Sequence, residues 1–186
     1  IEAPRFQLLL RTAPVQHRVA EDLGVAHQRV HVVRRDDGGA EESQLVHGAH
    51  EAADLHEVGL SSAHADYHKH TAYVLEHADM PGFSNDDQML LSFLSLGHQG
   101  KLGKLKRFET NNAWWLTLLS LRLAVMLMRR REDRETLPLS LQARGKTVQI
   151  HLDHEWRASH PLSQASLLAE VQAWQSDIND LSLELV

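Results

Sequence analysis

The stretch Leu55-His56-Glu57-Val58-Gly59-Leu60, followed by Tyr67-His68-Lys69-His70, carries most of the information in this sequence. It places histidine, carboxylate and lysine side chains at the ends of short apolar segments, where they can converge on one ion. Seven of the fourteen histidines fall between His47 and His77. Histidine is the commonest metal ligand and is easily tuned near neutral pH. The window therefore predicts a functional site, for which a metal ion and a phosphate group are both candidates.

Composition limits the class of protein. At 186 residues the chain has room for one ordinary domain or two small ones, and an apolar fraction of 42% supports a buried core. Cysteine is absent, which excludes disulfides and thiolate metal sites and fits a reducing compartment. No apolar run reaches the roughly 20 residues that span a bilayer. We therefore expect a cytoplasmic protein without a transmembrane segment, with association to a membrane surface left open.

Charge is distributed unevenly along the chain. The net charge of -6 argues against a general nucleic-acid binder. From His98 to Arg131, however, there are eight Lys or Arg residues and only one acid, Glu109. We call this segment the basic stripe. It predicts a local anion site, and the alternative of equal weight is a solvated helix face with a positively charged helix end.

Apolar spacing predicts helices over most of the first 130 residues. Residues 1 to about 50 show only weak helical spacing, which Asp36-Asp37-Gly38-Gly39 interrupts. From Glu51 onward the pattern predicts a helix that stops at Gly59, taken as its C-terminal cap. Further helices are predicted over 67–78, over 84–97 with a capping box of Ser84 and Asp87, and over 114–128 as a buried core helix; a loop is predicted over 100–106.

Beyond the charged linker Glu132–Glu135, apolar residues recur at every second position instead of at helical spacing. Alternating apolar residues over 137–141 and 148–152, with a turn at 144–146, predict a β-hairpin. A helix capped by Ser163 and a closing strand over 181–185 follow. The predicted fold class is mainly α: a helical domain followed by a small α+β domain. The predicted divisions are a poorly matching N-terminal segment over 1–50, a helical domain over 51–132 and an α+β domain over 133–186.

The candidate site can be read in two ways. His56 and Glu57 stand near a helix end, and His68, His70 and His98 begin or end neighbouring segments. Such ligands could hold Zn, Mn or Fe, which accept imidazole and carboxylate together. The same positions serve as phosphate contacts, because Lys69, Lys101 and protonated histidines supply positive charge. A chance His-Glu pair among surface histidines is the plain alternative. Trp114 and Trp115 are interpreted as core or hinge packing rather than as a stacking platform.

A family resemblance adds to this picture. The strings Ala53-Asp54-Leu55-His56-Glu57-Val58-Gly59-Leu60, Tyr67-His68-Lys69-His70-Thr71-Ala72-Tyr73-Val74-Leu75 and Asp79-Met80-Pro81-Gly82-Phe83 carry it. Together with Leu121-Arg122-Leu123-Ala124-Val125 and the Trp156 to Trp174 region, they resemble the C-terminal half of the bacterial exopolyphosphatase and guanosine-pentaphosphate phosphohydrolase family. The resemblance covers roughly Ala52 to Val186. Upstream of Glu51 the sequence departs from the family pattern, and our hypothesis for that departure is a misread frame or a scrambled segment.

The resemblance implies a layout. Family members carry two actin-like domains that hold an Mg-dependent hydrolysis site, then a helical domain like the HD metal phosphohydrolases, then a small α+β domain. This chain would hold the last two, in a parent that forms a homodimer. His56-Glu57 takes the position of the His-Asp pair of HD enzymes, and the Glu implies a site without metal. Any metal would have His56, Glu57, His70 and His98 as its ligands.

The resemblance also implies a role, in which these domains wall a basic channel that feeds inorganic polyphosphate to the actin-like catalytic domains. No catalytic residue and no cofactor are then expected in this chain, and Mg is expected for the parent. The expected substrate contacts are His56, Glu57, His68, Lys69, His70, His98 and Lys101. Gln99 stands where the family has Arg, which would weaken anion affinity there. One rival is an autonomous HD-type metal phosphohydrolase acting on nucleotides. Another is a structural module that dimerises through the 114–128 helix.

Overall fold

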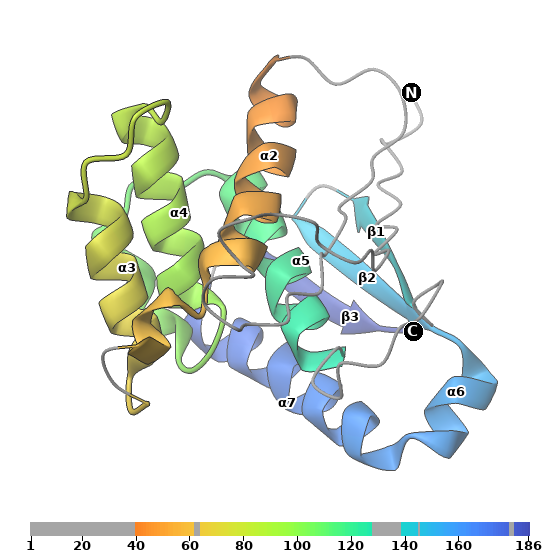
Figure 1. Cartoon of the computed structure of the whole chain (residues 1–186). Coiled ribbons are helices and arrows are strands. Elements are labelled where there is room, and N and C mark those ends of the chain that lie inside the picture. Colours follow the sequence, from red (N-terminus) through yellow and green to blue (C-terminus); the bar gives the residue numbers. More distant parts are fainter. Residues whose placement is uncertain (1–39, 62–63, 128–138, 145, 179–180) are drawn as a thin grey trace.

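The computed structural model describes residues 40–61, 64–127, 139–144, 146–178 and 181–186. Its architecture is mainly helical, with a small three-stranded sheet near the C-terminus (Figure 1). This confirms the predicted fold class. The elements in chain order are α2 (Ala40–Leu55), η1 (Val58–Ser61), α3 (Tyr67–His77), α4 (Asn85–Gly97), η2 (Leu102–Arg107), α5 (Asn112–Leu127), β1 (Leu139–Arg144), β2 (Thr147–Leu152), α6 (His154–Ser159), α7 (Pro161–Asp177) and β3 (Ser182–Leu185).

Helix α2 begins at Ala40, well before Glu51, from which the sequence predicts a helix. Its buried positions include Gly48, Ala49 and Ala52. A Cβ atom at Gly48 would lie 2.6 Å from a methyl carbon of Leu90, so α2 and α4 approach closely there. Small residues on the packed face give no apolar stripe, because glycine and alanine are weak signals of burial in a sequence. The part of α2 before Glu51 was therefore not predicted.

The predicted cap at Gly59 is wrong. The α-helix ends at Leu55, and Gly59 lies inside the 3-10 helix η1. Its backbone N–H donates to the Thr71 hydroxyl at 2.9 Å. Close approach of η1 to α3, rather than helix termination, is therefore the reason for a glycine here.

Helices α3 and α4 form an antiparallel pair at one side of the molecule (Figure 1). The predicted capping box at the start of α4 is confirmed. The Ser84 N–H donates to Asp87 Oδ2 at 2.9 Å, and the Asp87 N–H donates to Ser84 Oγ at 3.2 Å. These two bonds satisfy backbone donors that the first turn of a helix leaves free. The start of α4 is thus determined locally, as the sequence predicts.

Helix α5 is the central core helix. Trp115 is buried and meets the rings of Phe93 and Trp174 edge-on, with centroid separations of 5.2 and 5.7 Å. The interpretation of Trp115 as core packing is confirmed. Among the described residues, no helix is long and apolar enough to cross a membrane. The segment predicted as a loop before α5 instead contains η2, whose Leu102 and Leu105 are buried.

The sheet has the order β1-β2-β3. Strands β1 and β2 form the predicted antiparallel hairpin, and β3 lies parallel to β2. Helix α7 begins at Pro161, with His160 as its N-cap, so the predicted cap at Ser163 is wrong. Proline is favoured in the first helical turn because its absent N–H would have no partner there. The buried side chains of the helices and the sheet form one continuous core. The predicted boundary near residue 132 falls outside the described residues.

Candidate functional site

The structure brings three histidines from separate elements together. His56 follows α2, His68 lies in the first turn of α3 and His98 caps the end of α4. The His98 ring centroid lies 4.9 Å from that of His56 and 6.3 Å from that of His68. The Tyr67 ring is 5.6 Å from His98. We call His56, Tyr67, His68 and His98 the histidine cluster.

His98 is the most buried member of the cluster, with 3% of its surface exposed. Its Nδ1–H donates to the Ser95 carbonyl at 2.7 Å, and the Tyr67 hydroxyl donates to Nε2 at 3.1 Å. Burial, followed by the nearby His56, lowers the pKa of His98 to about 3. His98 is therefore a neutral ring near neutral pH, with both nitrogens hydrogen-bonded inside the protein.

His56 and Glu57 stand on the turn that leaves α2. The His56 Nδ1–H donates to the Ala53 carbonyl at 2.7 Å, and His56 Nε2 lies 4.0 Å from a Glu57 carboxylate oxygen. The Thr71 hydroxyl of α3 lies 3.1 Å from the His56 carbonyl oxygen. Backbone contacts with α3 thus determine where this pair sits relative to the rest of the cluster.

A substitution at Gly59 tests the close approach of η1 to α3. A Cβ atom at this position would lie 2.2 Å from the Tyr67 carbonyl oxygen and 2.8 Å from the Thr71 nitrogen, and both are backbone atoms. We expect Gly59→Ala to lower the free energy of unfolding by about 2–3 kcal/mol, because a packed backbone gives way only with strain. Urea denaturation measures it. Gly103→Ala is the matched control, since nothing lies within 4 Å of its added Cβ. Equal effects of the two changes would contradict the packing argument.

A chain of hydrogen bonds links α3 to η2 through Gln99. The Gln99 side-chain amide donates to His68 Nδ1 at 3.0 Å, and Lys104 Nζ donates to the Gln99 carbonyl oxygen at 2.6 Å. Burial, followed by the positive charge of Lys104, lowers the pKa of His68. Because Nδ1 accepts, the proton of the neutral His68 ring lies on Nε2. Gln99 therefore bridges the histidine cluster and a lysine, which its sequence position alone did not indicate.

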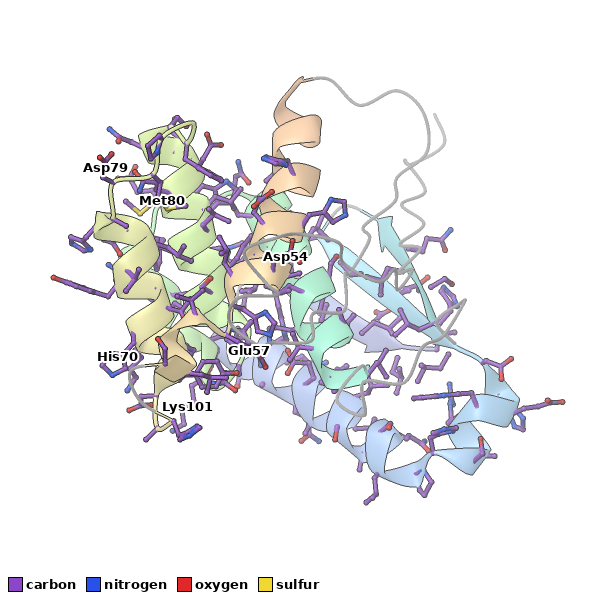
Figure 2. The ribbon with its side chains drawn as sticks, in the orientation of Figure 1. Asp54, Glu57, His70, Asp79, Met80 and Lys101 are labelled. Atoms are coloured by element: carbon purple, nitrogen blue, oxygen red, sulfur yellow. The ribbon has the colours of Figure 1, made fainter. Side chains whose placement is uncertain are left out.

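The remaining predicted site residues lie outside the buried cluster. Lys69, His70 and Lys101 are exposed, and Lys69 Nζ pairs with Asp66 Oδ2 at 2.9 Å. That hydrogen bond and the Lys69 charge hold the pKa of Asp66 below its usual value. Figure 2 shows His70 and Lys101 at the same end of the α3–α4 pair as Glu57, whereas Asp79 and Met80 mark the opposite end. The predicted residues thus share one end of the helix pair but divide into a buried and an exposed group.

The basic stripe is not one continuous surface. Arg122 is buried and pairs with Glu170, and Arg107 pairs with Glu76 at 2.7 Å. Lys101 and Lys106 are exposed, and Lys104 is half-buried. Residues 129–131 lie outside the described residues. Tertiary pairing therefore engages the buried Arg122 and the exposed Arg107 with carboxylates and leaves lysines around η2 as candidates for an anion. Lys104 and Tyr67 belong to the site and were not predicted; the only sequence signal for Lys104 was its place in the stripe.

The histidine cluster does not have the geometry of a metal site. Within the described ranges, no three His, Asp or Glu side chains gather in a way that could hold a metal ion. Of the four conditional ligands, His70 is exposed on α3, while both His98 nitrogens are engaged by Ser95 and Tyr67. What the arrangement offers chemically is the Nε2–H of the neutral His68 ring beside lysine ammonium groups, which suits an oxyanion.

Comparison with known proteins identifies the family of the chain. The family model described as Ppx/GppA phosphatase, domain III, matches residues 13–171. That range begins upstream of Glu51, so it includes most of the segment in which we expected a departure from the family pattern.

Two relatives are both named guanosine-5'-triphosphate,3'-diphosphate pyrophosphatase. The chain is 31% identical to the protein of Pseudoalteromonas translucida over 121 residues. This alignment covers 63% of the chain and 24% of that protein. The chain is 31% identical over 128 residues to the protein of Vibrio vulnificus, covering 68% of the chain and 26% of that protein. The chain thus spans about a quarter of the length of these curated relatives. Because the family model covers most of the sequence, the chain belongs to the Ppx/GppA phosphatase family and represents its domain III.

Proposed function

We propose that the chain is the polyanion-binding C-terminal module of a Ppx/GppA phosphatase, which guides inorganic polyphosphate to actin-like catalytic domains of the parent protein. The observation that carries the proposal is the meeting of lysines and neutral histidines at one end of α3 and α4. In this proposal the helical part is an HD-like scaffold without metal. The parent is a cytoplasmic, Mg-dependent homodimer, and this chain binds polyphosphate but releases no phosphate alone.

The chemistry of the ligand supports the proposal. Polyphosphate repeats one charged group, so several weak contacts can hold it while still allowing it to slide. Exposed Lys69 and Lys101 supply point charges, which suit phosphate without fixing its orientation. The two relatives are named for guanosine-5'-triphosphate,3'-diphosphate, which also presents consecutive phosphates. Competition between the two ligands on this chain would show which one the module prefers.

A binding experiment tests the function. We expect long-chain polyphosphate to bind at low ionic strength, with an affinity that falls by a log–log slope of about -0.7 per neutralised charge as salt rises. Lys69→Ala and Lys101→Ala should each weaken binding about two- to fivefold, the scale of one exposed charge contact. Lys146→Ala, an exposed lysine of the hairpin turn, is the control and should have no effect. Absence of binding by the unaltered chain at low salt would overturn the proposal.

The same preparation separates the rival functions. An autonomous metal phosphohydrolase requires phosphate release from nucleotides when Mn or Fe is added to the chain. A purely structural module requires a stable dimer that does not respond to polyphosphate. Either result would replace the guiding role proposed here.

A further inference from the structure

Lys104 occupies an unusual position for a lysine of this molecule. It belongs to η2 and is half-buried, and its Nζ donates to the Gln99 carbonyl at 2.6 Å. A Cβ atom built on Gly100 would lie 3.4 Å from the same Nζ. The ammonium group is therefore held against the chain that follows α4, beside the first turn of α3. Among the residues that the structure describes, Gln99 accepts from one of its three donors, and the other two have no hydrogen-bond partner.

The charges around Lys104 are unbalanced. Positive groups act on it from two directions, Lys69 on α3 and Arg122 on α5, while the neutral rings of His68 and His98 lie on the same side of the molecule. Each acid nearby has another partner, although the Asp66 charge also acts on Lys104 and opposes the lowering of its pKa. Asp66 pairs with Lys69, Glu170 of α7 pairs with Arg122, and Asp177 of α7 accepts the Leu102 N–H at 3.2 Å.

Within the part of the chain that the structure describes, no carboxylate oxygen lies within ion-pair distance of Lys104 Nζ. Burial, followed by the charges of Arg122 and Lys69, lowers the pKa of Lys104 to about 8. A half-buried ammonium among other cations is costly without an anion beside it.

We infer that Lys104, with Lys69 and the neutral ring of His68, holds one phosphate group of the polyanion, and that Lys104 anchors it more strongly than the exposed Lys101. The inference rests on the proposed function and deepens it. A contact from a partly desolvated ammonium is stronger than one from a fully solvated lysine, because water screens the latter. The sequence pointed to Lys101; the burial of Lys104 places the anchor three residues later.

The test compares matched variants of the full 186-residue chain with long-chain polyphosphate as the probe, near neutral pH and at low salt. We expect Lys104→Met to weaken binding about tenfold or more, the scale of a hydrogen bond to a charged group, and Lys101→Met to weaken it about two- to fivefold, the scale of one exposed charge contact. Urea denaturation of Lys104→Met verifies that the variant is folded. If it is not, Lys104→Arg, which keeps the charge and donors, carries the comparison.

A pH series separates direct contact from a structural effect. Affinity of the unaltered chain should fall as the pH rises through about 8 toward 9, since Lys104 then loses its proton. Lys104→Arg should keep its affinity over this range, because arginine stays charged. Calorimetry at about pH 8 in buffers of different ionisation enthalpy should show proton uptake on binding, because an anion raises the pKa of a lysine beside it.

The outcomes distinguish the two proposals. If the unaltered chain does not bind polyphosphate, the proposed function fails and this inference fails with it. If it binds, and Lys101→Met loses more affinity than Lys104→Met, the inference alone is overturned. The same follows if Lys104→Arg shows the same fall in affinity at high pH as the unaltered chain.

Discussion

Replacing Arg122 by methionine is expected to lower the free energy of unfolding by about 3–5 kcal/mol, because it leaves the Glu170 carboxylate buried without its cation. Both side chains are 7% exposed. The guanidinium makes a two-pronged contact with Glu170, and its Nη1 also donates to the carbonyls of Gly97 and Gly100, at 2.6 and 3.1 Å. Glu170 in turn accepts the Trp174 indole N–H at 2.7 Å. This one arginine therefore joins α4, α5 and α7. Urea denaturation measures the loss.

Two further variants test whether the effect of Arg122→Met comes from the buried charge of Glu170. Arg107→Ala breaks an ion pair with Glu76, but the Arg107 side chain is 49% exposed, so we expect a loss below about 1 kcal/mol. The double change Arg122→Met with Glu170→Leu should recover part of the stability lost by Arg122→Met, because no charge then stays buried alone. A double variant no more stable than Arg122→Met would mean that shape, rather than charge, governs this contact.

Lowering the pH from about 7 to about 4.5 is expected to remove roughly 2–3 kcal/mol of stability through His98. Its pKa of about 3 in the folded protein lies below the usual 6.5. The unfolded chain therefore takes up a proton first as the pH falls. The stabilising contribution is complete above pH 6.5 and declines toward pH 3. The lowered pKa of His68 adds an effect of the same sign. Denaturation curves at several pH values measure the slope.

Two variants test whether His98 causes this dependence of the free energy of unfolding on pH. His98→Gln removes the titrating group and keeps a hydrogen-bonding side chain, so its stability should depend less on pH between about 6.5 and 4.5. His70→Gln alters an exposed histidine of α3 and should leave the slope of the unaltered chain in place. If His98→Gln retained the full slope, acid sensitivity would have to arise at other groups.

Local signals account for most of the elements that the sequence predicted. The capping box of Ser84 and Asp87 and the period-two segments of the hairpin each depend on residues near one another in the chain, and both are confirmed. Three features that depend on packing were predicted wrongly or missed. Helix α2 packs through Gly48, Gly59 serves close approach rather than capping, and η2 forms where Leu102 and Leu105 reach the core.

By itself the sequence determined the class of the fold, the family and the end of the molecule on which chemistry-bearing residues gather, because composition, periodicity and motif strings are local. Only the tertiary structure decided which of those residues are buried, which are exposed and which are paired with a carboxylate. It buried His98 between Ser95 and Tyr67, placed His70 on an exposed face and paired Arg122 with Glu170, 48 positions away. Burial and pairing depend on what other elements bring to a side chain. A positive charge is therefore paired with a carboxylate at Arg122, whereas among the described residues no carboxylate lies within ion-pair distance of Lys104.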